Sequence, residues 1–412
     1  MSETREIDGY GPLPVARPGQ VNDVAALIRE ASAGGTALYP IGGGTSLALG
    51  NPPSQPGRVV DLRGLDQIID FPARDMTVTV QAGITMKSLA DTLARENLRL
   101  PIDVPRSETA TLGGVLAANV NGARRYGFGT LRDYVIGISA LNDEGREFKA
   151  GGRVVKNVAG YDLCKLLVGS LGTLGIITQV TLKLRPLPEI QAVLLLHADT
   201  DQLERLLATL HASRTRPSCI ELINRAAAGT IFQQVRLGEP ESAWVGFVGY
   251  EGNVDAVAWQ VQQIIKEVGK QCRIDGQIDF TAKPLCNAMI EFGAEATTFK
   301  ATMLPGATAE FCRAVDIEPA RPQVRSHAGS GIVYGHWDAG LTLEQAASML
   351  KEWRELAAEG KGDVVVTRCP SAWKQTLDVW GPPRNDAWLM RDVKAKFDPK
   401  GIFNPGRFVD GI

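Results

Sequence analysis

The chain has 412 residues, 44% hydrophobic and 22% charged, which is the composition of a globular protein long enough for two domains. Its 44 Lys and Arg residues nearly balance its 46 Asp and Glu residues. This argues against a nucleic-acid-binding protein, which would have an excess of basic residues. No apolar run reaches the ~18 residues of a membrane span and the N-terminus lacks a secretory signal pattern, so we expect a cytoplasmic protein.

The cysteine spacing argues against a metal or cluster site. No two of the six cysteines form a C-x-x-C pair, the spacing that zinc and iron–sulfur sites commonly use. We therefore expect buried free thiols, and a protein with no iron–sulfur cluster of its own.

The N-terminal part of the chain reads as two small lobes. Apolar periodicity predicts, in the first lobe, helices at 21–33 and 86–96 and strands at 37–40, 59–62 and 76–80. In the second lobe it predicts helices at 109–119 and 161–168, a hairpin of 135–141 and 147–149 around a turn at 142–145, and a strand at 175–184. Arg185-Pro-Leu-Pro188 then breaks the pattern and marks a domain boundary.

Beyond that boundary strands and helices alternate. Strands are predicted at 193–196, 219–223, 244–249, 331–336 and 363–368, and helices at 201–212, 254–268 and 343–358. This order favours a mixed or antiparallel sheet with helices on one face. A last helix at 387–397 leads into a turn-rich tail at 398–407, which we expect to pack back onto the first domain. The expected division is a first domain at 1–187, with lobes of about 1–104 and 105–187, a second domain at 188–375, and a returning segment at 376–412.

Three glycine-rich stretches lie within the first domain. They are Pro40-Ile-Gly-Gly-Gly-Thr-Ser46, Thr109-Ala-Thr-Leu-Gly-Gly114 and Gly169-Ser-Leu-Gly-Thr-Leu-Gly-Ile176. The first can turn consecutive N–H groups into one concavity, which suits a pyrophosphate. It is neither the G-x-G-x-x-G of a nicotinamide fold nor a P-loop, because no Lys follows. The three together predict a groove for a dinucleotide, although a single stretch could equally be an ordinary turn.

The second stretch continues into a helix of small residues. Gly113, Gly114, Ala117 and Ala118 remove bulk from one helical face, which suits either a flat ring or close helix packing. The bend that follows carries Arg124 and Arg125, which are either solvated or placed near a phosphate or a substrate carboxylate.

These stretches, their order and the tail Phe397-Asp-Pro-Lys-Gly-Ile-Phe-Asn-Pro-Gly406 resemble the FAD-binding domain of the vanillyl-alcohol oxidase / p-cresol methylhydroxylase family. The resemblance implies an α+β fold in which a two-lobed domain grips FAD and an α+β cap covers the flavin. Within the family, the chain is most similar to the FAD-binding subunits of bacterial glycolate oxidases. Those work beside a larger flavoprotein subunit and an iron–sulfur subunit, which would be this chain's partners.

The resemblance assigns FAD-binding positions residue by residue. In its terms the residues from Pro40 to Ser46 form the pyrophosphate loop and those from Pro105 onward line the cleft, while the third stretch contacts the adenosine side. The assigned positions are Pro40, Ile41, Gly42, Gly43, Gly44, Thr45, Ser46, Pro105, Thr109, Thr111, Gly113, Gly114, Asn119, Gly122, Gly127, Gly172, Thr173, Gly175, Ile176, Ile177 and Asn404. The first loop has no His, and 105–131 no Cys, for a covalent tether, so we expect non-covalent FAD.

Ser326-His-Ala-Gly-Ser-Gly-Ile-Val-Tyr-Gly-His336 resembles a stretch of related 2-hydroxy-acid dehydrogenases in which two His help to hold a divalent metal. His327 matches the first His, but Ser330 and Tyr334 stand where the relatives have Asp and the second His. His336 lies two residues further, on the same strand face as Tyr334. We expect no metal here, and His327 and His336 are the candidate catalytic residues.

The expected function is that of the FAD-binding subunit of a glycolate oxidase complex, which supports oxidation of glycolate or another small 2-hydroxy acid and passes electrons to other subunits. Through such a complex the chain could also sit at the inner membrane. One alternative is an autonomous FAD-dependent 2-hydroxy-acid dehydrogenase with His327 or His336 as base and Arg125 or Arg325 as carboxylate ligand. Another is a structural subunit with a non-reactive flavin site.

Overall fold

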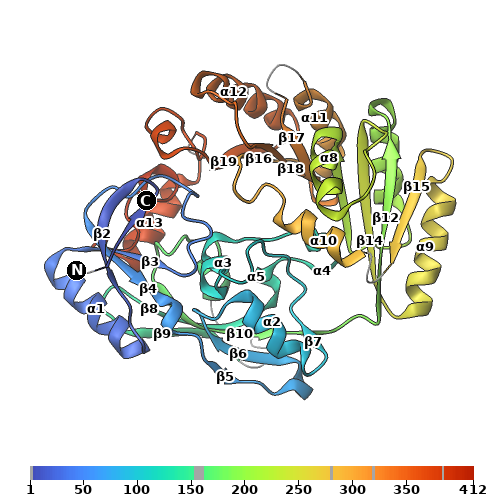
Figure 1. Ribbon diagram of the computed structural model, residues 1–412. Helices are drawn as coiled ribbons and strands as arrows, with labels where there is room; N and C mark the ends of the chain where they lie inside the picture. The colour runs from blue at the N-terminus through green and yellow to red at the C-terminus, as the bar shows by residue number, and fades with distance from the viewer. Residues whose placement is uncertain (1–2, 153–161, 279–281, 318–320, 383–384) are drawn as a thin grey trace. The chain divides into compact units, whose positions relative to one another are not determined.

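The computed structural model describes residues 3–152, 162–278, 282–317, 321–382 and 385–412. Two compact units account for the chain (Figure 1): the first comprises Met1–Val120, Thr130–Pro186 and Ser371–Ile412, and the second Asn121–Gly129 and Leu187–Pro370. Nothing in the sequence indicates that the short segment Asn121–Gly129 belongs to the second unit. Whether the units are independent domains with the expected boundaries stays a prediction.

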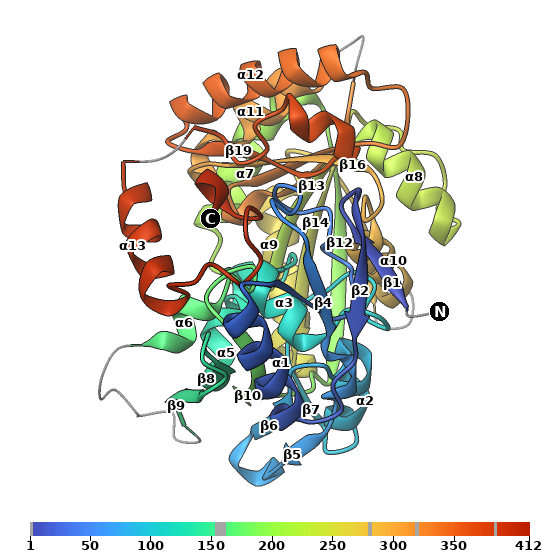
Figure 2. The ribbon, with the colours of Figure 1, turned by 90° about the vertical axis from the view of Figure 1, so that its left-hand side faces the viewer.

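In the described part of the first unit, one sheet has four strands in the order β1-β2-β4-β3. The hairpin of β1 (Thr4–Ile7) and β2 (Tyr10–Ala16) is antiparallel, and β2 lies beside β4 (Gly57–Asp61), as Figure 2 shows. Both β2 and β3 (Ala37–Ile41) pair with β4 in parallel. The apolar stripe of helix α1 (Val21–Gly34) packs on this sheet. The first glycine stretch begins at the end of β3. Because β3 is almost entirely buried, it holds the start of that stretch in a fixed position.

A second sheet of the first unit has five described strands in the order β5-β6-β10-β8-β9, and all its pairs are antiparallel. The strands are β5 (Ile68–Asp70), β6 (Thr77–Gln81), β8 (Val135–Leu141), β9 (Glu147–Gly151) and β10 (Ile176–Lys183), and a separate short pair joins β7 (Leu98–Arg99) to β11 (Arg185–Pro186). The helices are α2 (Met86–Ala94), α3 (Leu112–Ala118), α5 (Leu131–Tyr134), α6 (Leu163–Leu167) and α13 (Ala387–Phe397). One core joins the two sheets, since Leu141 and Ile176 pack with Leu38 and with Phe403 of the tail.

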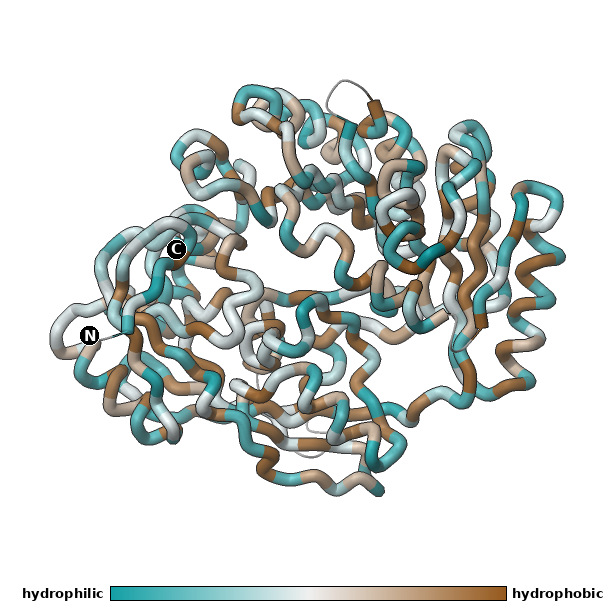
Figure 3. The backbone as a smooth tube through the Cα atoms, viewed as in Figure 1, coloured by the Kyte–Doolittle hydropathy of each residue, from teal (hydrophilic) through white to brown (hydrophobic). Residues whose placement is uncertain are grey.

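The second unit is built on an antiparallel sheet with eight strands in its described residues, in the order β15-β12-β14-β13-β17-β18-β16-β19. The strands are β12 (Ile190–Ala198), β13 (Cys219–Asn224), β14 (Trp244–Gly252), β15 (Arg273–Ile278), β16 (Thr297–Thr302), β17 (Gln323–His327), β18 (Ile332–Trp337) and β19 (Asp363–Arg368). Hydrophobic residues follow β12 and β14 along most of their length (Figure 3), because both faces of these strands are buried.

Helices cover both faces of this sheet, so the expectation of helices on one face is wrong. The helices are α4 (Arg125–Phe128), α7 (Leu203–Ala212), α8 (Arg225–Val235), α9 (Val254–Val268), α10 (Ala282–Glu291), α11 (Thr308–Val315) and α12 (Leu343–Glu359). α8 and α10 pack on Val193 and Phe247. α9 lies on the opposite face, where its Gln260 donates to the carbonyl of Thr215, which in turn contacts Tyr250. Of all the helices that the structure describes, none is both long and apolar enough to cross a membrane.

Candidate functional site

The three glycine stretches meet around two adjoining hollows of the first unit. Their empty volumes are about 610 and 430 Å³, and Pro40, Ile41, Gly42 and Thr111 line both. The other expected residues that line one or both hollows are Gly43, Gly44, Thr45, Ser46, Gly113, Gly114, Gly172, Gly175, Ile176, Ile177 and Asn404. The structure thus brings together residues that lie more than three hundred positions apart in the chain.

The first stretch presents free hydrogen-bond donors to this groove. Within the described residues, the backbone N–H groups of Gly43–Ser46 donate to no protein acceptor. Gly44 has φ +74°, a left-handed conformation that helps turn successive N–H groups toward one point. Consecutive donors of this kind suit the diphosphate of a dinucleotide.

Gly42 and Gly43 are also required by the fold itself. A Cβ atom at Gly42 would lie 1.8 Å from Oγ1 of Thr111, and one at Gly43 would lie 1.6 Å from the carbonyl oxygen of Thr109. The first stretch therefore packs directly on the second through its glycines. Packing explains these glycines as turn residues, and it also fixes the loop whose free donors we expect to bind the cofactor.

The second stretch enters α3 at Thr111, whose hydroxyl caps the helix by accepting from N–H of Gly114. Its small residues fit both interpretations that the sequence left open. Gly113 also packs on Ala82, directly after β6, where a Cβ would approach to 2.8 Å, and Gly113, Gly114, Ala117 and Ala118 all line the groove. The groove wall is consequently low and flat, as a planar ring system needs.

The third stretch is held by the C-terminal tail. Leu171 has a left-handed φ of +50°, and its carbonyl accepts from the side-chain amide of Asn404. Lys394 of α13 donates to the carbonyl of Thr173 at 2.8 Å and to that of Phe403 at 2.9 Å. The tail is therefore part of the groove wall and also its support.

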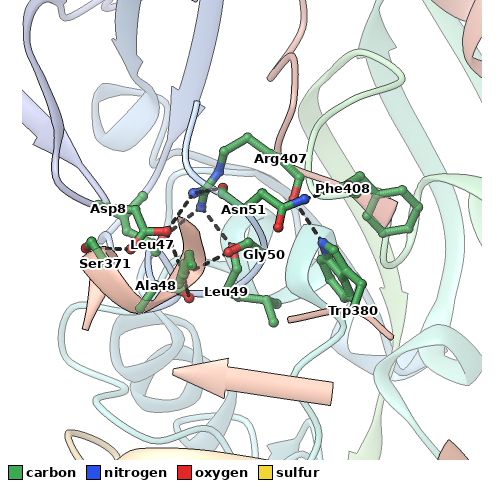
Figure 4. A network of polar contacts seen from close by, with 11 residues as sticks. Asp8, Leu47, Ala48, Leu49, Gly50, Asn51, Ser371, Trp380, Arg407 and Phe408 are labelled. Carbon is green, nitrogen blue, oxygen red and sulfur yellow. Dashed lines mark hydrogen bonds and ion pairs between the residues drawn. The ribbon is translucent and has the colours of Figure 1, made fainter. Parts of the chain in front are cut away.

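Two buried cations of the C-terminal segment brace the loop that follows the first stretch (Figure 4). Figure 4 shows Arg407 reaching this loop, and Lys374 donates to the carbonyls of Ala48 and Gly50 at 2.6 and 2.8 Å and to Asp8 at 2.6 Å. Arg407 donates to further carbonyls of the same loop, at Leu47, Leu49 and Asn51. Both cations also pair with Asp8, so one carboxylate balances two charges.

Six of the expected FAD-binding residues do not line these hollows. Pro105, Thr109, Asn119 and Thr173 belong to the first unit and lie in the segments that form the walls. Gly122 and Gly127 belong to the second unit, where a Cβ at Gly127 would lie 2.7 Å from Cα of Ser218. Close backbone approach to the residue before β13 accounts for Gly127 by packing, and a place for Gly122 and Gly127 near FAD stays a prediction.

A second constellation lies on the sheet of the second unit. Nδ1 of His327 is 2.6 Å from Oε1 of Glu221, and Nε of Arg325 is 3.2 Å from Oε2 of the same carboxylate. All three side chains are buried. Because a carboxylate only accepts, His327 donates through Nδ1 and its Nε2 carries the lone pair. Burial, assisted by Arg325 and Arg125, keeps the pKa of His327 below its ordinary value although Glu221 raises it.

Arg125 is near enough to this constellation for its charge to lower the pKa of His327. The ring of Tyr126, the next residue, sits against Gly329, where a Cβ would approach the ring to 2.5 Å. That contact docks α4 on the turn directly after His327. Arg125 is half-buried and, among the described residues, its side chain forms no ion pair or hydrogen bond. Arg325, the other candidate for a carboxylate ligand, is occupied by Glu221.

His336 is a buried neutral imidazole. Its Nδ1 is 2.9 Å from the Thr298 hydroxyl, which itself donates to the carbonyl of Ala296, so Nδ1 carries the proton. The ring stacks on Tyr334 at 5.9 Å, which confirms that the two share a strand face, and it meets the edge of Phe292 at 5.2 Å. Burial lowers the pKa of His336 to about 3. In the part of the chain that the structure describes, no group of three or more His, Cys, Asp or Glu is placed to hold a metal.

Sequence reasoning did not single out Glu221, Lys374 or Arg407. Glu221 stands in the strand Cys219-Ile-Glu-Leu-Ile-Asn224, where a charged residue between apolar ones on an otherwise buried strand could have signalled a buried partner. No local signal marks Lys374 or Arg407, because their partners lie more than three hundred residues away in the sequence.

Comparison with known proteins agrees with this geometry. The family described as "FAD binding domain" matches residues 12–151, and the family described as "FAD linked oxidases, C-terminal domain" matches residues 383–408. Glycolate oxidase subunit GlcD of Bacillus subtilis is 27% identical over 96% of this chain and 88% of its own length. Glycolate oxidase subunit GlcE of Escherichia coli is 33% identical over 39% of this chain and 46% of its own length.

Among solved structures, an alkyldihydroxyacetonephosphate synthase shares the fold, with a TM-score of 0.68 and 17% identity over 96% of this chain and 77% of its own. A two-unit α+β fold with a glycine-walled, donor-rich groove defines an FAD-binding protein. Residues 12–151 thus match an FAD-binding domain and residues 383–408 the C-terminal domain of FAD-linked oxidases, and over nearly its whole length the chain is similar to a glycolate oxidase subunit.

Proposed function

We propose that this chain is an FAD-dependent oxidoreductase that converts a small 2-hydroxy acid to the 2-oxo acid and works as one subunit of a larger dehydrogenase. The observation that carries the proposal is the buried His327–Glu221 pair beside the unpaired Arg125. The names of the relatives support the substrate class, since they include glycolate oxidase subunits and a D-lactate dehydrogenase.

His327 is the proposed base. Its Nδ1–H is held by Glu221, so Nε2 can take the proton from the substrate hydroxyl as the carbonyl forms. Because burial lowers the pKa of His327, the imidazole is already unprotonated at neutral pH and ready to accept. FAD, when bound, accepts the two electrons and the α-hydrogen that the hydroxy acid loses. His336 is not assigned a catalytic role, because it is packed against Phe292 and Tyr334.

Arg125 is the proposed ligand of the substrate carboxylate. A guanidinium with free donors, held next to the base, fixes the acid end of the substrate while its hydroxyl faces Nε2 of His327. We propose a short 2-hydroxy acid because the names of the relatives include glycolate oxidase subunits and D-lactate dehydrogenases.

The test is anaerobic reduction of the FAD-loaded chain by glycolate and by D-lactate, followed through the flavin absorbance. We expect bleaching with the intact protein, with His327→Gln at least ~100-fold slower, the usual contribution of a general base. Arg125→Gln is expected to raise the substrate concentration for half-maximal rate by ~10-fold or more with a smaller loss of the maximal rate. Bleaching that is equally fast in both variants would refute the assignment.

A second candidate function follows from Ser330 and Tyr334, which stand where related dehydrogenases have Asp and His. In that case the chain supports oxidation by a partner flavoprotein, as a subunit beside an iron–sulfur subunit. Co-purification of native partners, combined with the bleaching assay, distinguishes the two. The supporting role is favoured if 2-hydroxy acids do not bleach the flavin of the isolated FAD-loaded chain but do bleach it when the chain is in the complex.

A further inference from the structure

We propose that Arg5, on the N-terminal hairpin, supplies the positive charge that pairs with the diphosphate of FAD. Neither the glycine stretches nor the family resemblance points to this residue. The proposal concerns cofactor binding and does not depend on which substrate the protein oxidises.

The side chain of Arg5 lies on the first glycine stretch. Nη2 of Arg5 is 2.5 Å from the position that a Cβ at Gly44 would take, so in this structure the guanidinium lies directly against the Cα of Gly44. It adjoins the segment Gly43–Ser46, whose N–H groups donate to no protein acceptor within the described residues. Arg5 is not among the residues that line the two hollows, but its guanidinium lies beside a loop that lines one of them and carries free N–H donors. A cation next to such donors is the set of groups that an anion requires.

The other arginines near this loop are already occupied. Arg106 donates to the carbonyl of Thr45, and Arg407 is bound by Asp8 and by carbonyls of the following loop. The side chain of Arg5, in contrast, makes no hydrogen bond or ion pair with any acceptor in the described part of the chain. Of the three, Arg5 is the one whose guanidinium has no protein partner among the described residues.

The hairpin that carries Arg5 is held in place. Asp8, at the turn between β1 and β2, is bound by Lys374 at 2.6 Å and by the Ser371 hydroxyl at 2.9 Å. Arg5 itself pairs in the sheet with Leu13. Because the backbone is fixed before the cofactor binds, little ordering free energy is lost when the guanidinium meets the diphosphate.

The experiment compares FAD with riboflavin, which has the same ring and no phosphate. The apo-protein is titrated with each flavin, and dissociation constants are obtained from the change in flavin fluorescence. We expect Arg5→Gln to weaken FAD binding by ~10- to 100-fold, the range of a charge-assisted hydrogen bond, and to leave riboflavin binding unchanged. Arg5→Lys should retain part of the affinity.

Arg17→Gln is the matched control, because Arg17 lies just after β2 and pairs with Asp61 at 3.0 Å. It should leave both dissociation constants within about twofold. Salt gives an independent measure: the FAD dissociation constant should rise with salt less steeply in Arg5→Gln than in the intact protein. Equal losses for FAD and riboflavin, or an unchanged FAD affinity and salt slope, would overturn the proposal.

Discussion

Glu221 and His327 form a buried pair whose charge state decides when His327 can accept a proton. Burial, Arg325 and Arg125 lower the pKa of His327, and Glu221 opposes them by raising it. In Glu221→Gln the opposing charge is gone, so the pKa of His327 falls further. The acid limb of kcat/KM for the 2-hydroxy acid should therefore move to lower pH, while kcat falls by ~100-fold because the imidazolium loses its counter-ion.

The pH profile separates this positioning role from a merely structural one. Loss of packing would lower the amount of folded protein at every pH and leave the acid limb where it is. Glu221→Asp, which keeps the charge on a shorter side chain, should restore the position of the limb in part. An acid limb that stays in place in Glu221→Gln would contradict the assignment of Glu221.

Among single residues, the sequence identified those whose role depends on residues close to them in the chain. The glycine stretches could be recognised because a turn imposes its own residue types, and His327 because it stands in a recognisable motif. Glu221 could not be paired with His327, since the two are 106 positions apart and sheet register brings them together. Arg5 was missed for the same reason: it lies on β1, Gly44 follows β3, and only the folded structure brings the two residues together.

Among the secondary-structure elements, the N-terminal hairpin and the C-terminal segment act on the FAD loop through Lys374 and Asp8. Both side chains are buried, so Lys374→Met leaves Asp8 with less counter-charge and should destabilise the first unit by ~3–5 kcal/mol. Asp8→Asn/Lys374→Met removes both partners and should recover part of that loss, since Asn tolerates the left-handed φ of +53° at position 8. Urea unfolding of the apo-protein measures each free energy. A double variant no more stable than Lys374→Met would show that the two charges are not coupled.

The elements themselves were predicted unevenly, for physical reasons. Helices such as α9 and α13 are amphipathic and were placed at their observed bounds. The hairpin of β1 and β2 was not predicted, because β1 is polar and β2 contains Pro12 and Pro14, which argue against a strand. Helices on both faces of the large sheet could not be predicted. A strand buried on both faces has the same run of apolar residues whichever element covers each face.

For the whole molecule, the composition of the groove predicts how FAD is held. The described residues that line the two hollows include no His and no Cys, so no side chain there matches the usual covalent attachment to a flavin. FAD should therefore remain in the supernatant when the holoprotein is precipitated with acid, and the pellet should be colourless. Because FAD binds only the folded state, its removal should also lower stability, and free FAD at 100 times its dissociation constant should restore about 2.7 kcal/mol. A melting temperature that does not rise with FAD concentration, or flavin that stays with the precipitated chain, would mean that the cofactor is held by something other than the donors and small residues of this groove.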